Sequence, residues 1–548
     1  MSYRLGVRGG ISKMVDVDKA VADVARVFEE GGKDDALAIV RGMLEAVLRR
    51  NAELELDVAR LIKKYLGKTS ERVSDDQLAF LFSLLPKEEV PDDVPVAAPD
   101  AKLDDDEDED EDGAKKKKRS KHGRKPLPDT LRRVDVDIPV PEEERACVIC
   151  GADRTCIGHE TSERLQFKPA EFIVEVLKRE KLACNACEKD ISVAPVPDAV
   201  IPKGRPGGST LARIVVGKYE DHEPLTRQKK MFERLGVSIP VSTLADWVGG
   251  TATALEPIAE LIRKRVLDAH VLQADDTGLK VLDAKAPGGA KRGHMWFYVG
   301  DATLCAVAYT PDWTKEGPGL FLAARKGGWL VSDAYKGYDH IFSRKSDPPI
   351  EVGCWAHGRR GFVELADLGE PRVAPLLHYV KQLYKVEKAA TKAGADHAER
   401  LARRRSESAP ICEAIAKWCA QNHGSDPPKS AFAKAIGYVV NQWEALTRFL
   451  EDGALPLDNS LAERTLRGVA QGRKNYLFAG SDRGAMRAAT LYTIIATCKL
   501  NGVEPMAYVT DVLTKIETGT FPHGRLDELL PHEWSRTAPA SARIPTSR

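Results

Sequence analysis

The chain has 548 residues, of which 43% are hydrophobic and 30% are charged, and its 82 acidic residues balance its 82 basic residues. This length exceeds what one hydrophobic core supports, so we expect several domains. Because the formal net charge is zero, any affinity for nucleic acid must come from local basic patches. No apolar stretch approaches the roughly 20 residues of a membrane span, and the first residues show no signal-peptide pattern. A secreted disulfide framework is unusual at this length, so we expect reduced cysteines and a cytoplasmic protein.

The segment between residues 37 and 65 carries a heptad pattern, with mainly apolar residues at alternating spacings of three and four. Such a seam predicts a coiled coil that pairs two chains. A polar residue at an a-type position, here Asn51, fixes the register of such a pair. An amphipathic helix packed on its own domain is the alternative. The seam consists of Leu37, Val40, Leu44, Val47, Asn51, Leu54, Val58, Leu61 and Tyr65.

A charged linker is expected at residues 86–126. Nine consecutive acids fill residues 104–112, and a basic block follows at 115–125. Such a segment cannot bury enough apolar surface to fold, so it reads as a disordered tether.

Two Cys-x-x-Cys pairs come next, Cys147 with Cys150 and Cys184 with Cys187. Four thiolates in two such pairs can hold one structural Zn²⁺ in tetrahedral geometry. Residues 159–181 between the pairs have strand character, as a zinc ribbon requires, although the gap is longer than the common one. A redox Cys-x-x-Cys is the alternative, but no βαβ pattern supports it.

Residues 209–250 predict helices joined by short turns, which is the helix-turn-helix pattern. Arg227 and Lys230 belong to its basic residues, which could contact DNA phosphates. Ser242 and Thr243, at the start of the last helix, would be the residues that reach a groove. Ordinary helical packing explains the same pattern equally well.

From residue 271 the pattern changes to strands. Residues 271–282, 295–301 and 304–310 predict three strands, a helix is expected near 317–326, and residues 329–333 predict a fourth strand. This order forms the core of a ribonuclease-H-like α/β domain. A carboxylate at the end of the first strand, Asp275, and one at the end of the fourth, Asp333, are expected to meet at one edge of the sheet.

A long helical stretch is expected at residues 370–452, and only after it comes a helix that carries Glu463. Acidic residues at two strand ends and on a helix are what a two-metal site for phosphodiester chemistry requires, since Mg²⁺ prefers oxygen ligands. Arg467 lies four residues after Glu463, on the same helix face. Arg467, Arg473, Lys474 and Arg360 are candidate phosphate contacts, although solvated surface is the commoner role of any single one. For Trp355, near Arg360, we expect a place in the core.

The chain closely resembles the IS66 family of bacterial insertion-sequence transposases, which use an Asp-Asp-Glu (DDE) triad. The resemblance rests on several long motifs in a fixed order. They are LIKKYLGKTSER, GRKPLPDTLRR, GKYEDHEPLTRQKKMFERLGV, QADDTGLKVL, HMWFYVGD, SDAYKGYDHI, GCWAHGRRGF, DNSLAERTLR, GRKNYLFAGSDRGA and TCKLNGVEPMAYVTDVL.

This resemblance implies a transposase that binds the element's inverted-repeat ends and target DNA. It assigns Asp275, Asp333 and Glu463 as the catalytic triad, with two Mg²⁺ (or Mn²⁺) ions, and it makes the helices between Asp333 and Glu463 an insertion. It also implies small accessory proteins encoded by the same element. One departure is Asp276, where the family usually has Glu. Strand alternation places Asp275 and Asp276 on opposite faces, and we take Asp275 as the ligand.

Two other functions remain open at this point. One is a zinc-dependent DNA-binding regulator with an inactive nuclease core, which the presence of all three carboxylates argues against. The other is a ribonuclease-H-like repair nuclease, but the coiled coil and the zinc module favour pairing of element ends.

We therefore expect a multidomain α/β protein with a ribonuclease-H-like catalytic core. Its parts are a coiled-coil dimerisation region (1–85), a disordered linker (86–126), a zinc-binding domain (127–200), a helix-turn-helix-like DNA-binding domain (201–265), the catalytic core (266–369 and 453–500), a helical insertion (370–452) and a C-terminal segment (501–548).

Overall fold

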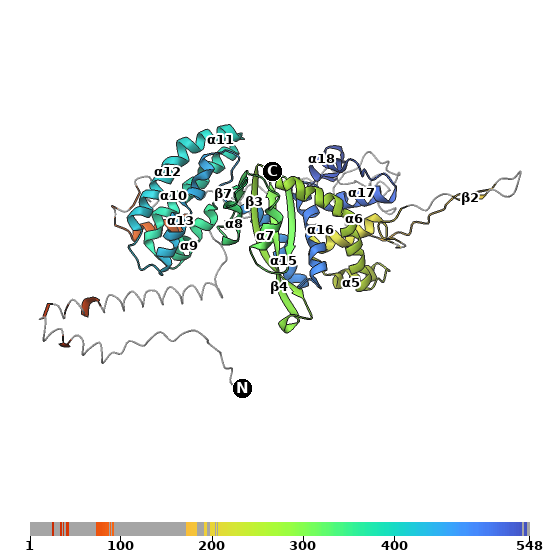
Figure 1. Cartoon of the computed structure of the whole chain (residues 1–548), viewed down its shortest axis with the longest axis horizontal. Helices are drawn as coiled ribbons and strands as arrows, with labels where there is room; N and C mark the ends of the chain where they lie inside the picture. The colour runs from red at the N-terminus through yellow and green to blue at the C-terminus, as the bar shows by residue number, and fades with distance from the viewer. Residues whose placement is uncertain are drawn as a thin grey trace, which may run out of the picture. The chain divides into compact units, whose positions relative to one another are not determined.

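The computed structural model describes residues 73–86, 171–183, 191–193, 198–202, 204, 206–539 and 542–544, with short pieces at 25–26, 33–34, 37, 40–42, 88 and 90–91 (Figure 1). They divide into two compact units. The first comprises residues 1–97, 331–334 and 351–459, and the second comprises residues 98–330, 335–350 and 460–548. Within the described parts of the chain, no helix is both long and apolar enough to cross a membrane.

The second unit is built on a sheet whose strands follow the predicted order. Strands β3 (Val271–Leu282), β4 (Ala290–Gly300) and β5 (Leu304–Thr310) form an antiparallel meander. The short strands β6 (Trp329–Val331) and β7 (Ile350–Val352), whose first residues belong to this unit, complete the order β5-β4-β3-β6-β7. The four strands expected from the apolar runs are therefore present, and β4 begins five residues earlier than expected, at residue 290 rather than 295.

Helices cover both faces of this sheet (Figure 1). On one face the ring of Phe297 contacts Tyr492 of α16 (Asp482–Leu500), and α6 (Val241–Leu267) and α15 (Ser460–Tyr476) also pack against the strands. On the other face Trp296 packs against Tyr338 and lies next to Gly317 of α7 (Glu316–Leu322). The remaining helices of the unit are α4 (Gly208–Tyr219), α5 (Leu225–Arg234), α8 (Asp339–Phe342), α17 (Pro505–Glu517) and α18 (Pro531–Thr537).

The outer edge of the sheet, strand β5, is closed by side chains of α16. The backbone N–H of Cys305 donates to Thr497 Oγ1 at 3.1 Å, and that of Val307 donates to Thr493 Oγ1 at 2.9 Å. The Thr497 hydroxyl in turn donates to the Cys305 carbonyl. Unpaired edge groups are a template for pairing with other chains, so these two threonines protect the sheet from aggregation.

The predicted helices at 209–250 are present, but the last of them, α6, runs to Leu267 and packs against the sheet. Its buried residues join those of α4, α16 and the strands in one hydrophobic core. The glycine pair at 249–250 lies inside the helix, where the missing side chains allow Arg487 and Ile201 to pack closely against it. A Cβ at Gly249 would lie 2.4 Å from the Arg487 guanidinium, and one at Gly250 would lie 2.2 Å from Ile201.

The first unit is a helical bundle that we define as helices α9 to α14. These are α9 (Trp355–Asp367), α10 (Ala374–Lys392), α11 (His397–Arg403), α12 (Ala409–Asn422), α13 (Ala431–Asn441) and α14 (Trp443–Thr447). A π-helical turn at Arg404–Ser408 joins α11 to α12. The short helix α3 (Asp75–Ser83) packs on the bundle. Every regular element between residues 370 and 452 is helical, as predicted.

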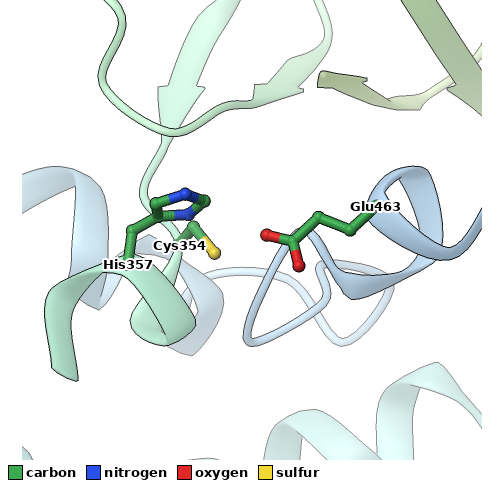
Figure 2. Close-up of side chains that lie close together, drawn as sticks. All are labelled: Cys354, His357 and Glu463. Carbon is green, nitrogen blue, oxygen red and sulfur yellow. The ribbon is translucent and has the colours of Figure 1, made fainter. Parts of the chain in front are cut away.

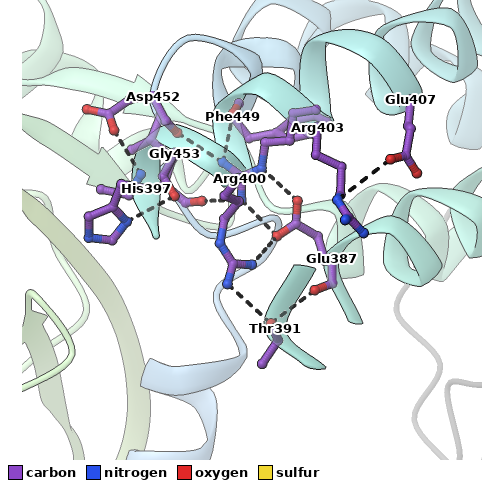
Figure 3. Close-up of polar contacts among 12 residues, drawn as sticks. Glu387, Thr391, His397, Arg400, Arg403, Glu407, Phe449, Asp452 and Gly453 are labelled. Carbon is purple, nitrogen blue, oxygen red and sulfur yellow. Dashed lines mark hydrogen bonds and ion pairs between the residues drawn. The ribbon is translucent and has the colours of Figure 1, made fainter. Parts of the chain in front are cut away.

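A buried arginine, Arg404, ties this bundle together, and Figure 3 shows its partners Glu387, Phe449 and Asp452. Arg404 is 1% exposed and pairs with Glu387 of α10 through two hydrogen bonds of 2.6 and 2.9 Å. Its other N–H groups donate to the backbone carbonyls of Phe449, Asp452 and Leu455. A buried charge is tolerable only with such complete pairing. Trp355 is also fully buried, and its indole N–H donates to the Leu446 carbonyl, so its predicted core role is confirmed.

A two-stranded hairpin precedes the core in the second unit. Strand β1 (Lys181–Ala183) pairs antiparallel with β2 (Ile191–Val193). The strand character expected over 159–181 is found only at residue 181 among the residues described there, since 171–180 have no regular structure.

Several predicted features fall outside the described residues. Of the heptad seam only Leu37 and Val40 are described, and both are helical. Nearly all of the charged linker and the four cysteines Cys147, Cys150, Cys184 and Cys187 lie outside as well, so the coiled coil and the zinc ligands stay predictions.

Candidate functional site

Asp275 and Asp276 lie on opposite faces of strand β3, and Asp275 lies inside this strand rather than at its end, where the apolar run predicted it, because the pairing with β4 continues to Leu282. Both are half-buried, and Asp275 pairs in register with Phe297. Residues directly opposite in an antiparallel pair share a face, and the Phe297 ring contacts Tyr492 of α16. Asp275 therefore belongs to the sheet face that α16 covers, as does Thr277, two residues further along the same strand.

The helix that carries Glu463 packs on the same strand. Glu463 is half-buried in the first turn of α15, which begins at residue 460. Arg473, near the other end of α15, donates from Nη1 to Thr277 Oγ1 at 2.9 Å and to the Gly278 carbonyl. Thus α15 is anchored to β3 through a residue on the Asp275 face, and both predicted acids of the second unit belong to elements in direct contact.

Asp333 belongs to the first unit. It follows strand β6 by two residues, is half-buried, and its backbone carbonyl accepts a hydrogen bond of 3.4 Å from the Tyr438 hydroxyl of α13. Burial raises the pKa of Tyr438 above its ordinary value, and nearby negative groups, Asp333 among them, raise it further. The Tyr438 hydroxyl therefore stays protonated and can keep donating.

Cys354 directly precedes helix α9 of the first unit and His357 lies in its first turn, as Glu463 lies in the first turn of α15 of the second (Figure 2). The buried Cys354 Sγ accepts the backbone N–H of Asn459 at 3.2 Å, which fixes the segment that leads to α15. Strand β7 ends two residues before Cys354.

Asp276 has a partner that the sequence pattern did not reveal. One carboxylate oxygen lies 2.6 Å from Nδ1 of His294, and the other accepts the indole N–H of Trp313 at 3.2 Å. The His294 ring stacks on Trp313 at 5.6 Å between centroids, and Trp313 stacks on Tyr335 at 4.8 Å. Asp276 is thus committed to a polar and aromatic cluster on the face away from Asp275. Only the register of β3 with β4 brings His294 within its reach.

The predicted DNA contacts differ in their surroundings. Arg473 is half-buried and engaged with β3, whereas four others are exposed: Arg227 and Lys230 on α5, and Arg467 and Lys474 on α15. Arg360 is half-buried on α9. Contact of any of them with DNA stays a prediction.

The sequence profile of the transposase IS66 family matches residues 203–487, which is more than half of the chain and includes Asp275, Asp333 and Glu463. The chain belongs to the IS66 transposase family. Three further profiles match other parts of it: the IS66 C-terminal element at 493–532, a zinc-finger binding domain of transposase IS66 at 144–188, and a segment described as transposase C of IS166 homeodomain at 53–136. The zinc-finger match includes all four predicted zinc cysteines.

Relatives of this IS66-family chain occur in Sinorhizobium fredii. The uncharacterized protein y4hP is 35% identical over 517 residues, which cover 90% of this chain and 90% of that protein. The uncharacterized protein y4qI is 30% identical over 548 residues, covering 94% of this chain and 96% of that protein. A third, y4jD, is 31% identical over 430 residues, 74% of this chain and 81% of that protein. The similarity therefore extends over nearly the whole chain.

Proposed function

We propose that this chain is the transposase of an IS66-like insertion sequence, which binds the element's ends, cuts the DNA there and joins it to target DNA. The observation that carries the proposal is the placement of Asp275 on the strand face against which the Glu463 helix packs. Its neighbour Asp276 faces away and is already paired with His294.

The element order supports a ribonuclease-H-like core. Three antiparallel strands, a helix and a fourth strand follow one another along the chain, and the fourth strand, β6, lies next to the first, β3. This is the arrangement in which a carboxylate of the first strand and one after the fourth belong to the same edge of a sheet.

The donor set fits hard divalent cations. Asp275, Asp333 and Glu463 would together hold two Mg²⁺ or Mn²⁺ ions, because these ions prefer carboxylate oxygens. When bound, such a pair neutralises charge on the attacking and leaving oxygens of a phosphodiester. The protein's own residues place the DNA, and holding the reacting groups in position accounts for several kcal/mol of a barrier. Arg467 and Lys474, exposed on the same helix as Glu463, would hold the backbone.

We propose one structural Zn²⁺ at Cys147, Cys150, Cys184 and Cys187. The β1–β2 pairing supports this proposal, because its register pairs Ala183 with Ile191, the described residues that flank the second Cys-x-x-Cys pair in the chain. A Cys-x-x-Cys knuckle at the turn of a hairpin suits tetrahedral zinc. The proposed partners are the DNA ends, target DNA, a second copy of the chain and accessory proteins of the element.

The test is a strand-transfer assay on DNA that carries the sequences flanking the gene. Asp275→Asn should lower strand transfer by about a thousandfold or more, because one carboxylate ligand to the metal pair is lost, while leaving DNA binding intact. Asp276→Asn is the matched control, with a much smaller loss. Equal activity of Asp275→Asn and the unaltered chain would refute the metal assignment.

A further inference from the structure

An open pocket of about 420 Å³ lies where the β3–β4 hairpin meets α15. Four of its seven lining residues are basic and none is acidic. They are Gly278, Leu279, Lys280, Ala290, Lys291, Arg292 and Arg473. We call this site the basic pocket. Its charge suits an anion.

The cations of the basic pocket are not neutralised within the fold. Lys280 and Arg292 are directly opposite in the β3–β4 register, and like charges in that position repel. Among the described residues neither forms an ion pair, whereas Lys291 pairs with Asp482 at 2.8 Å and with Asp283 at 3.4 Å. The pocket therefore retains positive charge from Lys280, Arg292 and Arg473.

The two guanidinium groups converge on one glycine. A Cβ at Gly278 would lie 2.4 Å from Arg292 Nε, and Arg473 donates to the Gly278 carbonyl. Glycine at this position leaves room for the Arg292 guanidinium. Arg473 is also fixed by its bond to Thr277, so the pocket is built before any ligand arrives.

Two large apolar side chains are exposed beside the pocket. Leu477 is 62% exposed and Phe478 is 40% exposed, directly after the last residue of α15. We call them the Leu477–Phe478 step. The next residue, Ala479, ties the step to β3: its N–H donates to the Lys280 carbonyl at 2.8 Å, and its carbonyl accepts from Leu282 at 2.9 Å. The step is therefore joined, through Ala479, to Lys280, which lines the basic pocket.

The backbone of the step is strained. Leu477 has a φ of 62°, in the left-handed region that a leucine rarely adopts. Such strain persists where the surrounding structure imposes it, and it concentrates at binding sites. Here the pairing of Ala479 with β3 imposes it and holds both side chains outward instead of in the core.

We propose that this surface binds one unstacked nucleotide of the DNA, with a backbone phosphate in the basic pocket and the base against Phe478 and Leu477. A nucleotide offers an anion and an apolar face within one residue, and sites for single strands combine a basic groove with aromatic platforms. Apolar side chains can also enter between bases and unstack them. The inference rests on the proposed function and names the form of DNA that this part of the transposase meets. An apolar protein partner would leave the repulsion between Lys280 and Arg292 unrelieved.

The test uses the full chain without divalent metal and two 30-bp duplexes, one fully paired and one with three central mismatches, each with 2-aminopurine at the centre. The unaltered chain should bind the mismatched duplex more tightly by about five- to hundredfold, the range expected for stacking of one base on an aromatic side chain. Phe478→Ala should remove this preference and Phe478→Tyr should keep it. Leu320→Ala, on α7, is the matched control, because Leu320 is 80% exposed but belongs to no basic site.

The phosphate contact in the basic pocket is tested separately, by the salt dependence of DNA binding. Replacing both Lys280 and Arg292 by Ala should weaken the binding of both duplexes alike and reduce the slope of log affinity against log salt by about 1, since the contact with one phosphate disappears. An unchanged mismatch preference in Phe478→Ala overturns the proposal, and so does a change in oligomeric state alone, which would mark a protein interface.

Failure of the inference and failure of the proposed function are distinguishable. Asp275→Asn should keep the mismatch preference while it loses strand transfer. If the unaltered chain prefers mismatched DNA but never transfers strands, the transposase proposal fails and the nucleotide site stands. If Phe478→Ala keeps both the preference and strand transfer, only the nucleotide site fails.

Discussion

The helical bundle of the first unit and the β3–β4 hairpin of the second treat their basic side chains in opposite ways. In the bundle, Arg404 is buried and its N–H groups all have acceptors. Nε and Nη2 each donate to one oxygen of the Glu387 carboxylate, and the remaining N–H groups donate to backbone carbonyls. In the hairpin, Lys280 and Arg292 face each other, and no carboxylate of the described residues pairs with either. A fully paired cation stabilises the fold, whereas cations that repel one another on a surface favour the binding of an anionic ligand. Burial and pairing, more than residue type, separate structural charge from binding charge.

Removal of the bundle's buried cation tests the structural side of this contrast most strongly. Arg404→Ala in the full chain should lower the free energy of opening of α10 and α12 by about 3–5 kcal/mol, because it leaves Glu387 buried without its main partner. Hydrogen–deuterium exchange of peptides from these helices measures the loss.

Arg403→Ala is the matched control for this experiment. Its partner Glu407 is one helical turn away at 3.6 Å, and both side chains are partly exposed (Figure 3). A pair of this kind contributes about 0.5 kcal/mol or less. Equal losses in the two variants would contradict a special role for Arg404.

Acid should weaken the bundle through Glu387. Burial alone raises the pKa of this carboxyl, but hydrogen bonds from Arg404 and Arg400 outweigh burial and leave the pKa below its ordinary value. A depressed folded pKa stabilises the protein above the unfolded pKa of about 4.3, and this contribution is lost as the pH falls through the folded value. Urea unfolding, followed by circular dichroism between pH 6 and pH 3, should show this loss of stability. Glu387→Gln should be less stable at pH 6 yet less sensitive to acid, and an unchanged pH dependence in that variant would count against Glu387 as the titrating group.

The smallest effect belongs to the hairpin. Lys280→Thr should leave the free energy of unfolding unchanged or raise it by about 0.2–1 kcal/mol, since it removes a like-charge pair across two strands. Lys291→Thr should act in the opposite direction, because Lys291 pairs with Asp482 and Asp283. Differential scanning calorimetry of the two variants measures these changes in stability. A clear loss of stability in Lys280→Thr would show that this lysine stabilises the fold.

The strands and the opposite faces of Asp275 and Asp276 could be predicted because a strand has a simple period. The alternation along residues 271–282 separates Asp275 from Asp276, and the structure keeps them on opposite faces. The extent of α6 could not be read in the same way. Two adjacent glycines and Pro257 suggest a break, yet close packing against Ile201 and Arg487 makes small residues useful inside this helix.

Long-range partners were the hardest to predict. The contact of Asp276 with His294 needs the register of two strands across 18 residues. The left-handed conformation of Leu477 needs the pairing of its neighbour Ala479 with Lys280, which no local pattern reveals. Such features depend on tertiary structure, and local propensity does not encode them.

The threonines that close strand β5 have a consequence for synthesis. Cys305 and Thr497 are 192 residues apart in the chain, so at about 5–20 residues per second the ribosome needs roughly 10–40 s to deliver the helix after the strand has emerged. During this interval a nascent chain displays an unsatisfied strand edge beside an apolar sheet face. Chaperone capture of the elongating polypeptide, or its loss to insoluble material in cells with few chaperones, should therefore be greatest before residue 500 is translated.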